Sequence, residues 1–372
     1  MYDINGKYCG ATIHGSLVEA EALAQVYDFC NHPIAENAKV VIMPDCHAGK
    51  GCTVGFTAEL TGNKIIPNIV GVDINCGILT SIFHADNIDF KALDDYIRSS
   101  IPSGMNVRTS VHKNVDNYII RRIDETLNFI GEVDKKEYHL KSLGTLGGGN
   151  HYIEIGHIED NKYALTIHTG SRNLGLRVCN FHQNIAKEKC NEKGIHKGLE
   201  YLTGEDFDNY ISDVEVVREF SEYNRRIIAN EILNFLNVKP IKSFETTHNY
   251  VELNNNKVII RKGAISAKTD QLLTIPLNMR DGVIIGVGKG NADWNYSAPH
   301  GAGRMLSRSK AKEVLKLEDF QEDMKNVASW SVSASTLDEA PKAYKPTEII
   351  VNEIKDTVDI KYIAKTVYNF KG

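Results

Sequence analysis

Residues that can bind metal ions recur directly after, or at the end of, apolar segments of this 372-residue chain. They are Asp45, His47, Asp73, Cys76, His151, His168, His248 and His300. A single histidine in such a setting is usually a hydrogen-bonded core residue. Several of them in the same setting weaken that interpretation and indicate a site built on a rigid sheet.

Asp73 and Cys76 lie three residues apart in a glycine-flanked turn, so both side chains could converge on one metal ion. A thiolate beside a carboxylate is electrostatically unfavourable unless a cation compensates both charges. Together with His151, His168 and His248, they supply the mixed ligands that two divalent ions bridged by one thiolate would require. Such a set suits Mn²⁺ or Zn²⁺ better than Ca²⁺, which prefers oxygen ligands.

A glycine-rich loop at residues 144–149 leads into an expected strand, unlike the dinucleotide-binding fingerprint, which leads into a helix. Its backbone amides could bind phosphate, with Asn150 and Glu154 reaching a nucleotide. A simple turn beside one buried histidine fits this segment equally well. Arg172 follows His168 in a loop of small residues, a setting that suits bidentate phosphate recognition.

His300 lies between Pro299 and Gly301, and these neighbours leave room for a substrate to approach the imidazole. The side chain could be a metal ligand, a general base, or a nucleophile that forms a phosphoryl or nucleotidyl adduct. The spacing leaves these three roles open.

Short segments rich in Ile and Val predict strands, and longer segments of helical periodicity predict helices. The expected strands are 39–43, 65–72, 78–84, 152–155, 163–168, 250–253, 258–260, 283–287 and 349–351. The expected helices are 16–29, 89–99, 114–133, 214–236 and 307–327. The pattern predicts an α+β (mixed α/β) fold with mostly antiparallel or mixed sheets flanked by helices. A hairpin turn is expected at 254–257.

Composition and charge narrow the class of protein. No linker, low-complexity tract or repeat interrupts the chain, so we expect one intertwined domain over 1–372. The formal net charge of −5 predicts no global basic field, so nucleic-acid binding would need a local basic surface. Seven scattered cysteines favour free thiols or metal ligands. Without a membrane-spanning or signal segment, a cytoplasmic protein with no membrane partner is expected.

Seven motifs in order make the sequence similar to the RtcB family of RNA ligases, which are GTP- and Mn²⁺-dependent enzymes that join RNA ends. The motifs are residues 43–51, 71–77, 149–151, 168–172, 248–250, 261–264 and 300–304. The resemblance covers nearly the whole chain. It implies that His300 is guanylylated by GTP and that two Mn²⁺ ions are bound. One ion would be held by Asp73, Cys76 and His151, and the other by Cys76, His168 and His248.

The resemblance also assigns residues to the nucleotide and to RNA. The guanine nucleotide would contact Asn150, Glu154, Asn249, Gly301, Ala302, Gly303 and Lys371. Phosphate groups or RNA ends would contact Arg172, Lys262 and Arg304. Further candidates for a basic RNA-binding face are Lys50, Arg177, Arg261, Lys268 and Arg280. Asp45 and His47 match an early family motif without a defined role beyond support of the site.

The reaction implied by the resemblance joins an RNA 2′,3′-cyclic phosphate or 3′-phosphate end to a 5′-hydroxyl end through a GMP–histidine intermediate. Both tRNA splicing and RNA repair fit this chemistry, and an activating protein partner is compatible with it. Residues 101–106 and 277–282 depart from the commoner family pattern. Nucleotide contacts within 276–283 are therefore left open.

Two other functions would use many of the same residues. A metal-dependent RNA phosphodiesterase or cyclic-phosphate hydrolase would use the ions without nucleotidylation of His300. A non-catalytic RNA-end binding protein would keep the metal only as a structural element. His300 combined with Lys371 favours the ligase, because a hydrolase has no need of a guanine pocket. A P-loop mechanism is disfavoured because its motif does not occur.

Overall fold

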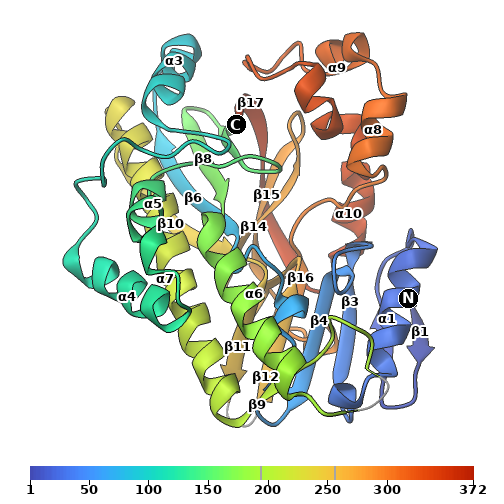
Figure 1. Ribbon diagram of the computed structural model, residues 1–372. Coiled ribbons are helices and arrows are strands. Elements are labelled where there is room, and N and C mark those ends of the chain that lie inside the picture. Colours follow the sequence, from blue (N-terminus) through green and yellow to red (C-terminus); the bar gives the residue numbers. More distant parts are fainter. Residues whose placement is uncertain (193–194, 255–256) are drawn as a thin grey trace.

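The computed structural model describes residues 1–192, 195–254 and 257–372. Two large β-sheets form the framework, and helices pack against them (Figure 1). The six-stranded sheet has the order β1-β2-β3-β4-β12-β11, with strands Tyr2–Asn5, Gly10–Ile13, Lys39–His47, Val54–Thr61, Lys257–Lys262 and Tyr250–Asn254. The seven-stranded sheet has the order β10-β6-β8-β7-β17-β15-β14, with strands Pro240–Thr247, Gly77–His84, Lys162–Thr169, Tyr152–Glu159, Val358–Lys371, Gly282–Gly288 and Leu272–Asn278.

Strand direction agrees with the fold class expected from the sequence. In these two sheets β2 and β3 are parallel, and the other strand pairs are antiparallel. Two short pairs complete the strands: β13 (Ala264–Ser266) with β16 (Ser297–Pro299), and β5 (Lys64–Ile65) with β9 (Leu202–Thr203). The pairing of Ala264 with Pro299 brings the loop at His300 beside the end of β12.

The helices lie on both sides of this framework. They are α1 Ala20–Cys30, α2 Pro67–Val70, α3 Phe90–Ser100, α4 Asn117–Phe129, α5 Lys136–Ser142, α6 Arg172–Lys189, α7 Gly204–Phe235, α8 Arg308–Val314, α9 Leu317–Asp323 and α10 Thr347–Glu353. The carboxylates of Asp89 and Asp116 accept backbone hydrogen bonds at the N-termini of α3 and α4, which explains where these helices begin. No helix within the described ranges combines the length and apolar character needed to cross a membrane.

Helix α7 links the two main parts of the hydrophobic core. Phe220 and Ile227 pack into the larger cluster, which extends over strands of the six-stranded sheet. Ile228 and Ile232 pack into a second cluster formed with strands of the seven-stranded sheet. In Figure 1, α6 and α7 run next to each other across this side of the molecule. One long helix therefore fixes both sheets relative to the loops that lie between them.

Several expected elements are confirmed, and two expected strands are wrong. Residues 65–72 contain only the end of β5, because Pro67 starts α2 and Gly71, at φ 95°, ends it. Residues 349–351 lie in α10, where Ile350 turns into the core. A three-residue apolar segment carries no period that separates helix from strand.

The expected helix over 307–327 is two helices, α8 and α9, separated by extended backbone at Leu315. The elements that were not expected from the pattern are strands β1, β2, β4, β9, β10, β13, β14, β16 and β17 and helices α5 and α6. The expected turn at 254–257 includes residues 255 and 256, which lie outside the described residues. The strands on either side of it, β11 and β12, pair antiparallel as expected.

Candidate metal and nucleotide site

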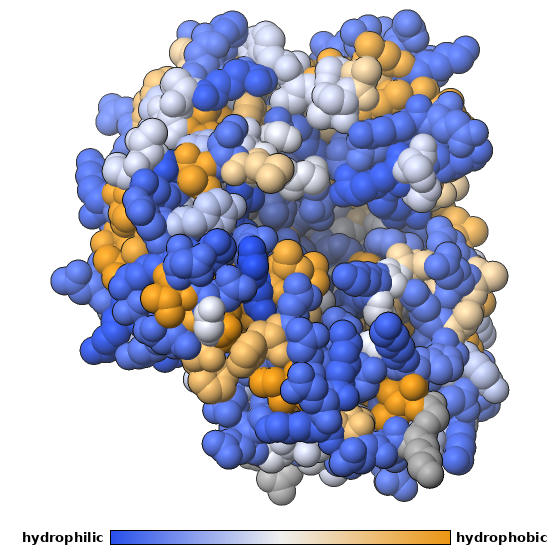
Figure 2. All heavy atoms as spheres, in the orientation of Figure 1, coloured by the Kyte–Doolittle hydropathy of each residue, from blue (hydrophilic) through white to orange (hydrophobic). Residues whose placement is uncertain are grey.

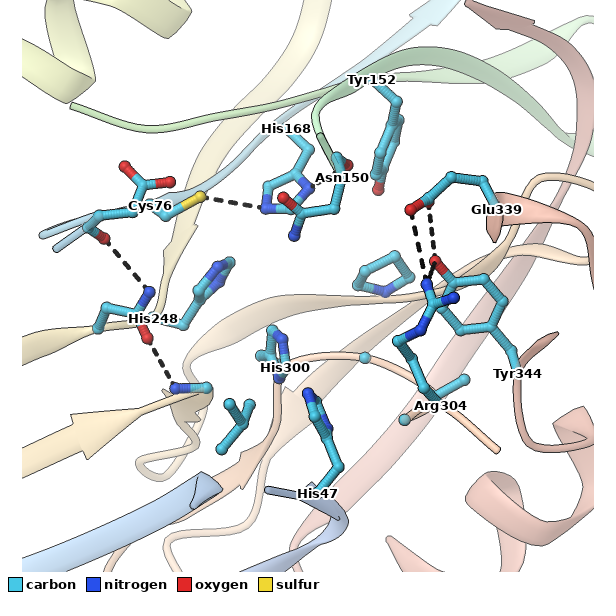
Figure 3. Close-up of a pocket in the computed structure, with 18 of the residues that line it drawn as sticks. His47, Cys76, Asn150, Tyr152, His168, His248, His300, Arg304, Glu339 and Tyr344 are labelled. Atoms are coloured by element: carbon cyan, nitrogen blue, oxygen red, sulfur yellow. Dashed lines mark hydrogen bonds and ion pairs between the residues drawn. The ribbon is translucent and has the colours of Figure 1, made fainter. Parts of the chain in front are cut away.

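Residues from both large sheets line a cavity of 390 Å³. The surface is hollowed near the centre of the view in Figure 2, and Figure 3 shows the interior side chains. Most residues selected from the sequence lie on the cavity wall: Asp73, Cys76, Asn150, Glu154, His168, His248, Asn249, Lys262, His300, Gly301, Ala302, Gly303, Arg304 and Lys371. His151 and Arg172 lie outside this wall.

Two groups of potential metal ligands share the thiol of Cys76. Asp73, Cys76 and His151 form one group, and Cys76, His168 and His248 form the other. Within each group the ligand atoms lie within 4.8 Å of one another. Cys76 Sγ lies 3.3 Å from Nε2 of His168 and 3.5 Å from Nε2 of His151. This mixed set of nitrogen, oxygen and sulfur donors fits a divalent metal ion.

Backbone carbonyls orient two of the imidazoles. Nδ1 of His151 donates to the carbonyl oxygen of Leu146 at 3.0 Å, and Nδ1 of His168 donates to that of Asn150 at 3.1 Å. Each contact places the ring proton on Nδ1 and leaves the Nε2 lone pair directed at Cys76. Such outer contacts are typical of metal-binding histidines.

The electrostatics of the two ligand groups favour the binding of a cation. Burial, with Asp73 adding to it, raises the pKa of the Cys76 thiol well above its usual range. Burial also lowers the pKa of His168 and of His248, which keeps both imidazoles neutral and able to bind metal. Burial alone would raise the pKa of Asp73, but contacts with His151, Cys76 and Ser171 together lower it below its ordinary value. A divalent ion would supply the charge that a Cys76 thiolate needs.

His300 is held by a buried carboxylate. Nδ1 of His300 lies 2.6 Å from Oδ2 of Asp45, and the same oxygen accepts hydrogen bonds from the backbone amides of His300 and Gly301. The His300 ring lies 4.7 Å from the His248 ring, measured between centroids. With Nδ1 occupied, Nε2 is the atom available to react beside the metal groups. The sequence motif did not predict that Asp45 contacts His300.

Glu154 lines the cavity, is buried and has unused hydrogen-bonding capacity. Asn369 donates to Oε2 of Glu154 at 2.9 Å, and burial raises the pKa of Glu154 to about 8. Oε1 of Glu154 and the hydroxyl of Tyr152 are both buried without a hydrogen-bond partner among the described residues. Buried polar atoms of this kind usually have partners, so these two could bind the polar edge of a ligand.

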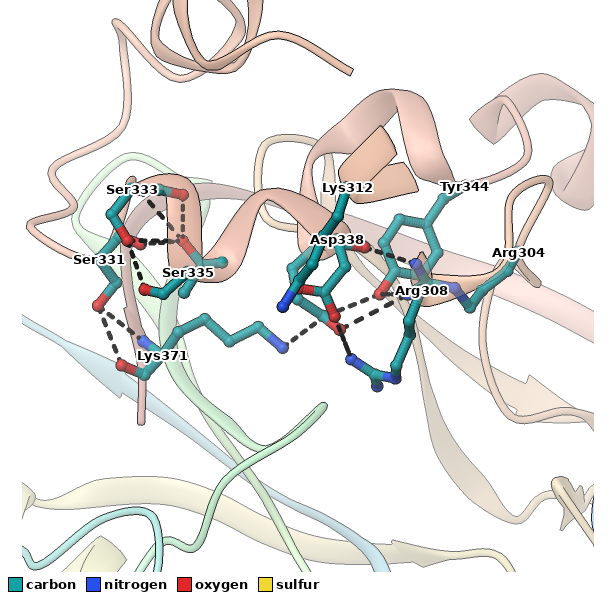
Figure 4. A network of polar contacts seen from close by, with 11 residues as sticks. Arg304, Arg308, Lys312, Ser331, Ser333, Ser335, Asp338, Tyr344 and Lys371 are labelled. Atoms are coloured by element: carbon teal, nitrogen blue, oxygen red, sulfur yellow. Dashed lines mark hydrogen bonds and ion pairs between the residues drawn. The ribbon is translucent and has the colours of Figure 1, made fainter. Parts of the chain in front are cut away.

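A second cluster, around Glu339, also lines the cavity and was not predicted from the sequence. Glu339 accepts from Lys371 Nζ at 2.6 Å, from Arg308 at 2.6 Å and from the Tyr344 hydroxyl at 2.8 Å (Figure 4). Burial alone would raise the pKa of Glu339, but Lys371 and Arg308 lower it to about 2. Figure 3 places Arg304, Glu339 and Tyr344 across the cavity from Cys76 and His248.

Asn249 and Gly303 shape the loops that carry other site residues. Asn249, at φ 61°, accepts from the Gly263 amide at 2.8 Å and donates to the Asp73 carbonyl at 3.2 Å. Gly303 has φ 77°, and a Cβ there would lie 2.8 Å from the Asp45 backbone. Glycine is therefore required where the His300 loop approaches Asp45.

The expected phosphate-binding cations have different surroundings. Lys262 lines the cavity and donates to the carbonyl of Lys50, and burial lowers the pKa of its ammonium group. Arg304 lines the cavity and donates to the Tyr344 hydroxyl at 3.1 Å. Arg172 instead lies beneath the glycine-rich loop, where it donates to Thr145 at 3.0 Å.

The prediction that Arg261 belongs to a basic RNA-binding face is wrong. This side chain is completely buried and donates to Glu252 at 2.7 Å, so it supports the sheet instead of an RNA surface. Lys268 is bound to the same carboxylate, and Arg280 lies 2.8 Å from Asp281. Lys50 remains on the cavity wall.

Comparison with known proteins gives a consistent family. A family model described as tRNA-splicing ligase RtcB matches residues 25–372. The chain is 30% identical to RNA-splicing ligase RtcB1 of Escherichia coli over 406 residues, covering 96% of each chain. It is 29% identical to RNA-splicing ligase RtcB of Escherichia coli K12, again covering 96% of each. It is 25% identical to tRNA-splicing ligase RtcB of Nanoarchaeum equitans, covering 88% of this chain and 86% of the relative. The chain therefore belongs to the RtcB family.

Proposed function

We propose that this protein is an RNA ligase that joins an RNA 2′,3′-cyclic phosphate or 3′-phosphate end to a 5′-hydroxyl end, with GTP and Mn²⁺ as cofactors. Family membership and the names of the relatives support an RNA ligase. Its substrates would be broken or spliced RNAs, in tRNA splicing or RNA repair.

One observation carries the proposal. The imidazole of His300 is oriented by Asp45 at 2.6 Å and lies beside His248, which belongs to one of the two ligand groups that share Cys76. A hydrolase would need the metal-binding groups. It would not need a further histidine, outside those groups, that is oriented toward a cavity large enough for a nucleotide. We assign His300 as the nucleophile and Asp45 as the residue that orients it.

The bond changes follow from this assignment. Nε2 of His300 attacks the α-phosphorus of GTP, a nitrogen–phosphorus bond forms, and pyrophosphate leaves with the electrons of the broken bond. Asp45 retains the hydrogen bond from Nδ1 and stabilises the positive charge that develops on the ring. Two divalent ions at the Cys76 groups would neutralise phosphate charge and align the reacting oxygens.

The later steps consume the adduct. Water opens a cyclic phosphate end to a 3′-phosphate. An oxygen of that 3′-phosphate attacks the GMP phosphorus and releases His300. The 5′-hydroxyl oxygen then attacks the activated 3′-phosphorus, forms the phosphodiester and expels GMP. We assign Lys262 and Arg304 to the phosphate groups, and Asn150, Glu154 and Lys371 to the nucleotide, because these residues line the cavity.

The test is incubation of the purified protein with α-³²P-GTP and Mn²⁺, followed by a denaturing gel. We expect an acid-labile label on the wild type and none on His300→Ala or Cys76→Ala. Cys179→Ala is the matched control, because this cysteine is buried outside both metal groups. An unlabelled wild-type protein that still opens cyclic phosphate ends would replace the ligase with the phosphodiesterase. RNA binding without either reaction would replace it with an RNA-end binding protein.

A further inference from the structure

The segments that carry the metal ligands come from distant parts of the chain and meet beside one helix. Asp73 and Cys76 lie in the turn before β6, His151 follows the glycine-rich loop 144–149, and His168 lies near the end of β8. Helix α7 contacts both β6 and β8 (Figure 1). Its buried face is therefore placed to set the spacing of these segments.

Arg225 on α7 joins two of the segments and is completely buried. Its Nη1 donates to the carbonyl oxygen of Thr169 at 2.8 Å and to that of Asn75 at 3.1 Å. Thr169 directly follows His168, and Asn75 directly precedes Cys76. One guanidinium thus ties the backbone beside His168 to the backbone beside the shared thiol.

Asn224, the preceding residue of α7, holds the third segment and is also completely buried. Its Oδ1 accepts from the amides of Gly144 at 2.8 Å and Thr145 at 3.0 Å, and its Nδ2 donates to the carbonyl of Thr145 at 3.1 Å. The same Nδ2 lies 3.4 Å from the carbonyl of Gly170. Asn224 therefore links the glycine-rich loop that leads to His151 with the loop after β8.

The chemistry of the two side chains suits alignment of backbone segments. A guanidinium offers several N–H donors in fixed directions, whereas a lysine ammonium is a mobile point donor. Glu245 accepts from Nε of Arg225 at 2.6 Å and supplies the opposite charge that a buried cation requires. Neither Asn224 nor Arg225 lies on the cavity wall, so their effect on the site is indirect.

We propose that Asn224 and Arg225 are positioning residues that set the relative placement of the two metal-binding groups. This inference rests on the proposed function, because it requires that the two groups bind metal. Outer contacts of this kind commonly contribute about 10-fold to 100-fold to metal affinity.

The test is titration of the full-length protein with Co²⁺, followed by the thiolate-to-cobalt absorption of Cys76 and by equilibrium dialysis. Arg225→Lys keeps the charge but loses the planar donor geometry, and Asn224→Leu keeps the size but loses the hydrogen bonds. We expect each variant to bind Co²⁺ about 10-fold or more weakly and to show a changed thiolate band. If one variant does not fold, the other provides the same test.

Asp213→Asn is the matched control, because Asp213 is also a buried polar residue of α7. Its carboxylate binds His182 at 2.7 Å and Thr126 at 2.9 Å, away from the metal groups. We expect this variant to lose thermal stability and to retain its Co²⁺ affinity. Equal loss of affinity in all three variants would show a general effect of destabilisation and overturn the inference.

Two further outcomes separate the inference from the proposed function. Wild-type affinity and an unchanged thiolate band in both Arg225→Lys and Asn224→Leu would overturn the inference and leave the metal site standing. A wild-type protein that binds no Co²⁺ and no Mn²⁺ would overturn the proposed metal site, and the positioning role with it.

Discussion

The carboxylate of Asp45 is the hydrogen-bond acceptor for Nδ1 of His300 at 2.6 Å, although the two residues are 255 positions apart in the chain. Asp45 is a buried residue near the end of β3, and His300 directly follows β16. The same carboxylate oxygen binds the amides of His300 and Gly301, so it fixes the loop and the ring together. This relationship gives His300 a defined reactive nitrogen.

Asp45→Asn should slow guanylylation of His300 by about 100-fold or more, since an amide can present its N–H group to the ring and favour the wrong tautomer. The measurement is the initial rate of label incorporation from α-³²P-GTP at saturating GTP. Asp293→Asn, on the exposed surface, is the control and should label at the wild-type rate. Unchanged labelling of Asp45→Asn would contradict the orienting role.

Cys76→Ser should weaken binding of both metal ions, because the thiol belongs to both ligand groups. His248→Ala should weaken only the ion held by Cys76, His168 and His248. Equilibrium dialysis with Mn²⁺ measures the number of ions bound by each variant. Retention of both ions by Cys76→Ser would contradict a shared thiolate.

The stability of the protein should fall between about pH 5 and pH 8 because of Glu154. Burial raises the pKa of this carboxyl to about 8 in the folded state, against an ordinary value of 4.5. Over this range the folded protein retains a proton that the unfolded chain loses, so rising pH favours unfolding, by an amount on the order of 3 kcal/mol.

Urea unfolding of the wild type and of Glu154→Gln at pH 5 and pH 8 measures this contribution. The glutamine variant lacks the titrating group, so its free energy of unfolding should change less with pH than that of the wild type. Parallel pH dependence in the two proteins would show that Glu154 is already ionised in the folded state at pH 5.

Glu339→Gln should destabilise the protein by about 3 kcal/mol, because it leaves the buried Lys371 ammonium without its carboxylate partner. The measurement is urea unfolding at neutral pH. The control is Asp95→Asn, whose partner Lys91 is 57% exposed and whose loss should cost less than about 1 kcal/mol. Similar losses in both variants would contradict a special role for the buried pair.

That the candidate metal ligands lie together could be predicted from the sequence, because each carries a distinctive type of side chain next to an apolar segment. Asp73, Cys76 and the histidines needed only residue type and local pattern. Asp45 and Glu339 could not be assigned, because their partners His300 and Lys371 meet them only after the chain has folded. Asn224 and Arg225 lie within a helix of ordinary periodicity, where buried polar residues leave no local signal.

The secondary structure likewise divides into elements that have a local sequence signal and elements that lack one. Long periodic segments such as 214–236 were identified correctly as helix, because periodicity reports burial on one face. Residues 65–72 and 349–351 were not, since short apolar segments carry no period and Pro67 decides the first of them. Strand β17 lacked a signal because its exposed and buried residues alternate only in part.

Strand β17 also constrains how the molecule can assemble during translation. It is synthesised after every other strand of the seven-stranded sheet, yet it lies between β7 and β15. Until residues 358–371 leave the ribosome, β7 and β15 each present an unpaired edge, and such edges recruit other chains. Asn369 and Lys371 reach the cavity on this same strand. A nascent chain therefore stays vulnerable to aggregation until the segment that completes the cavity has been made.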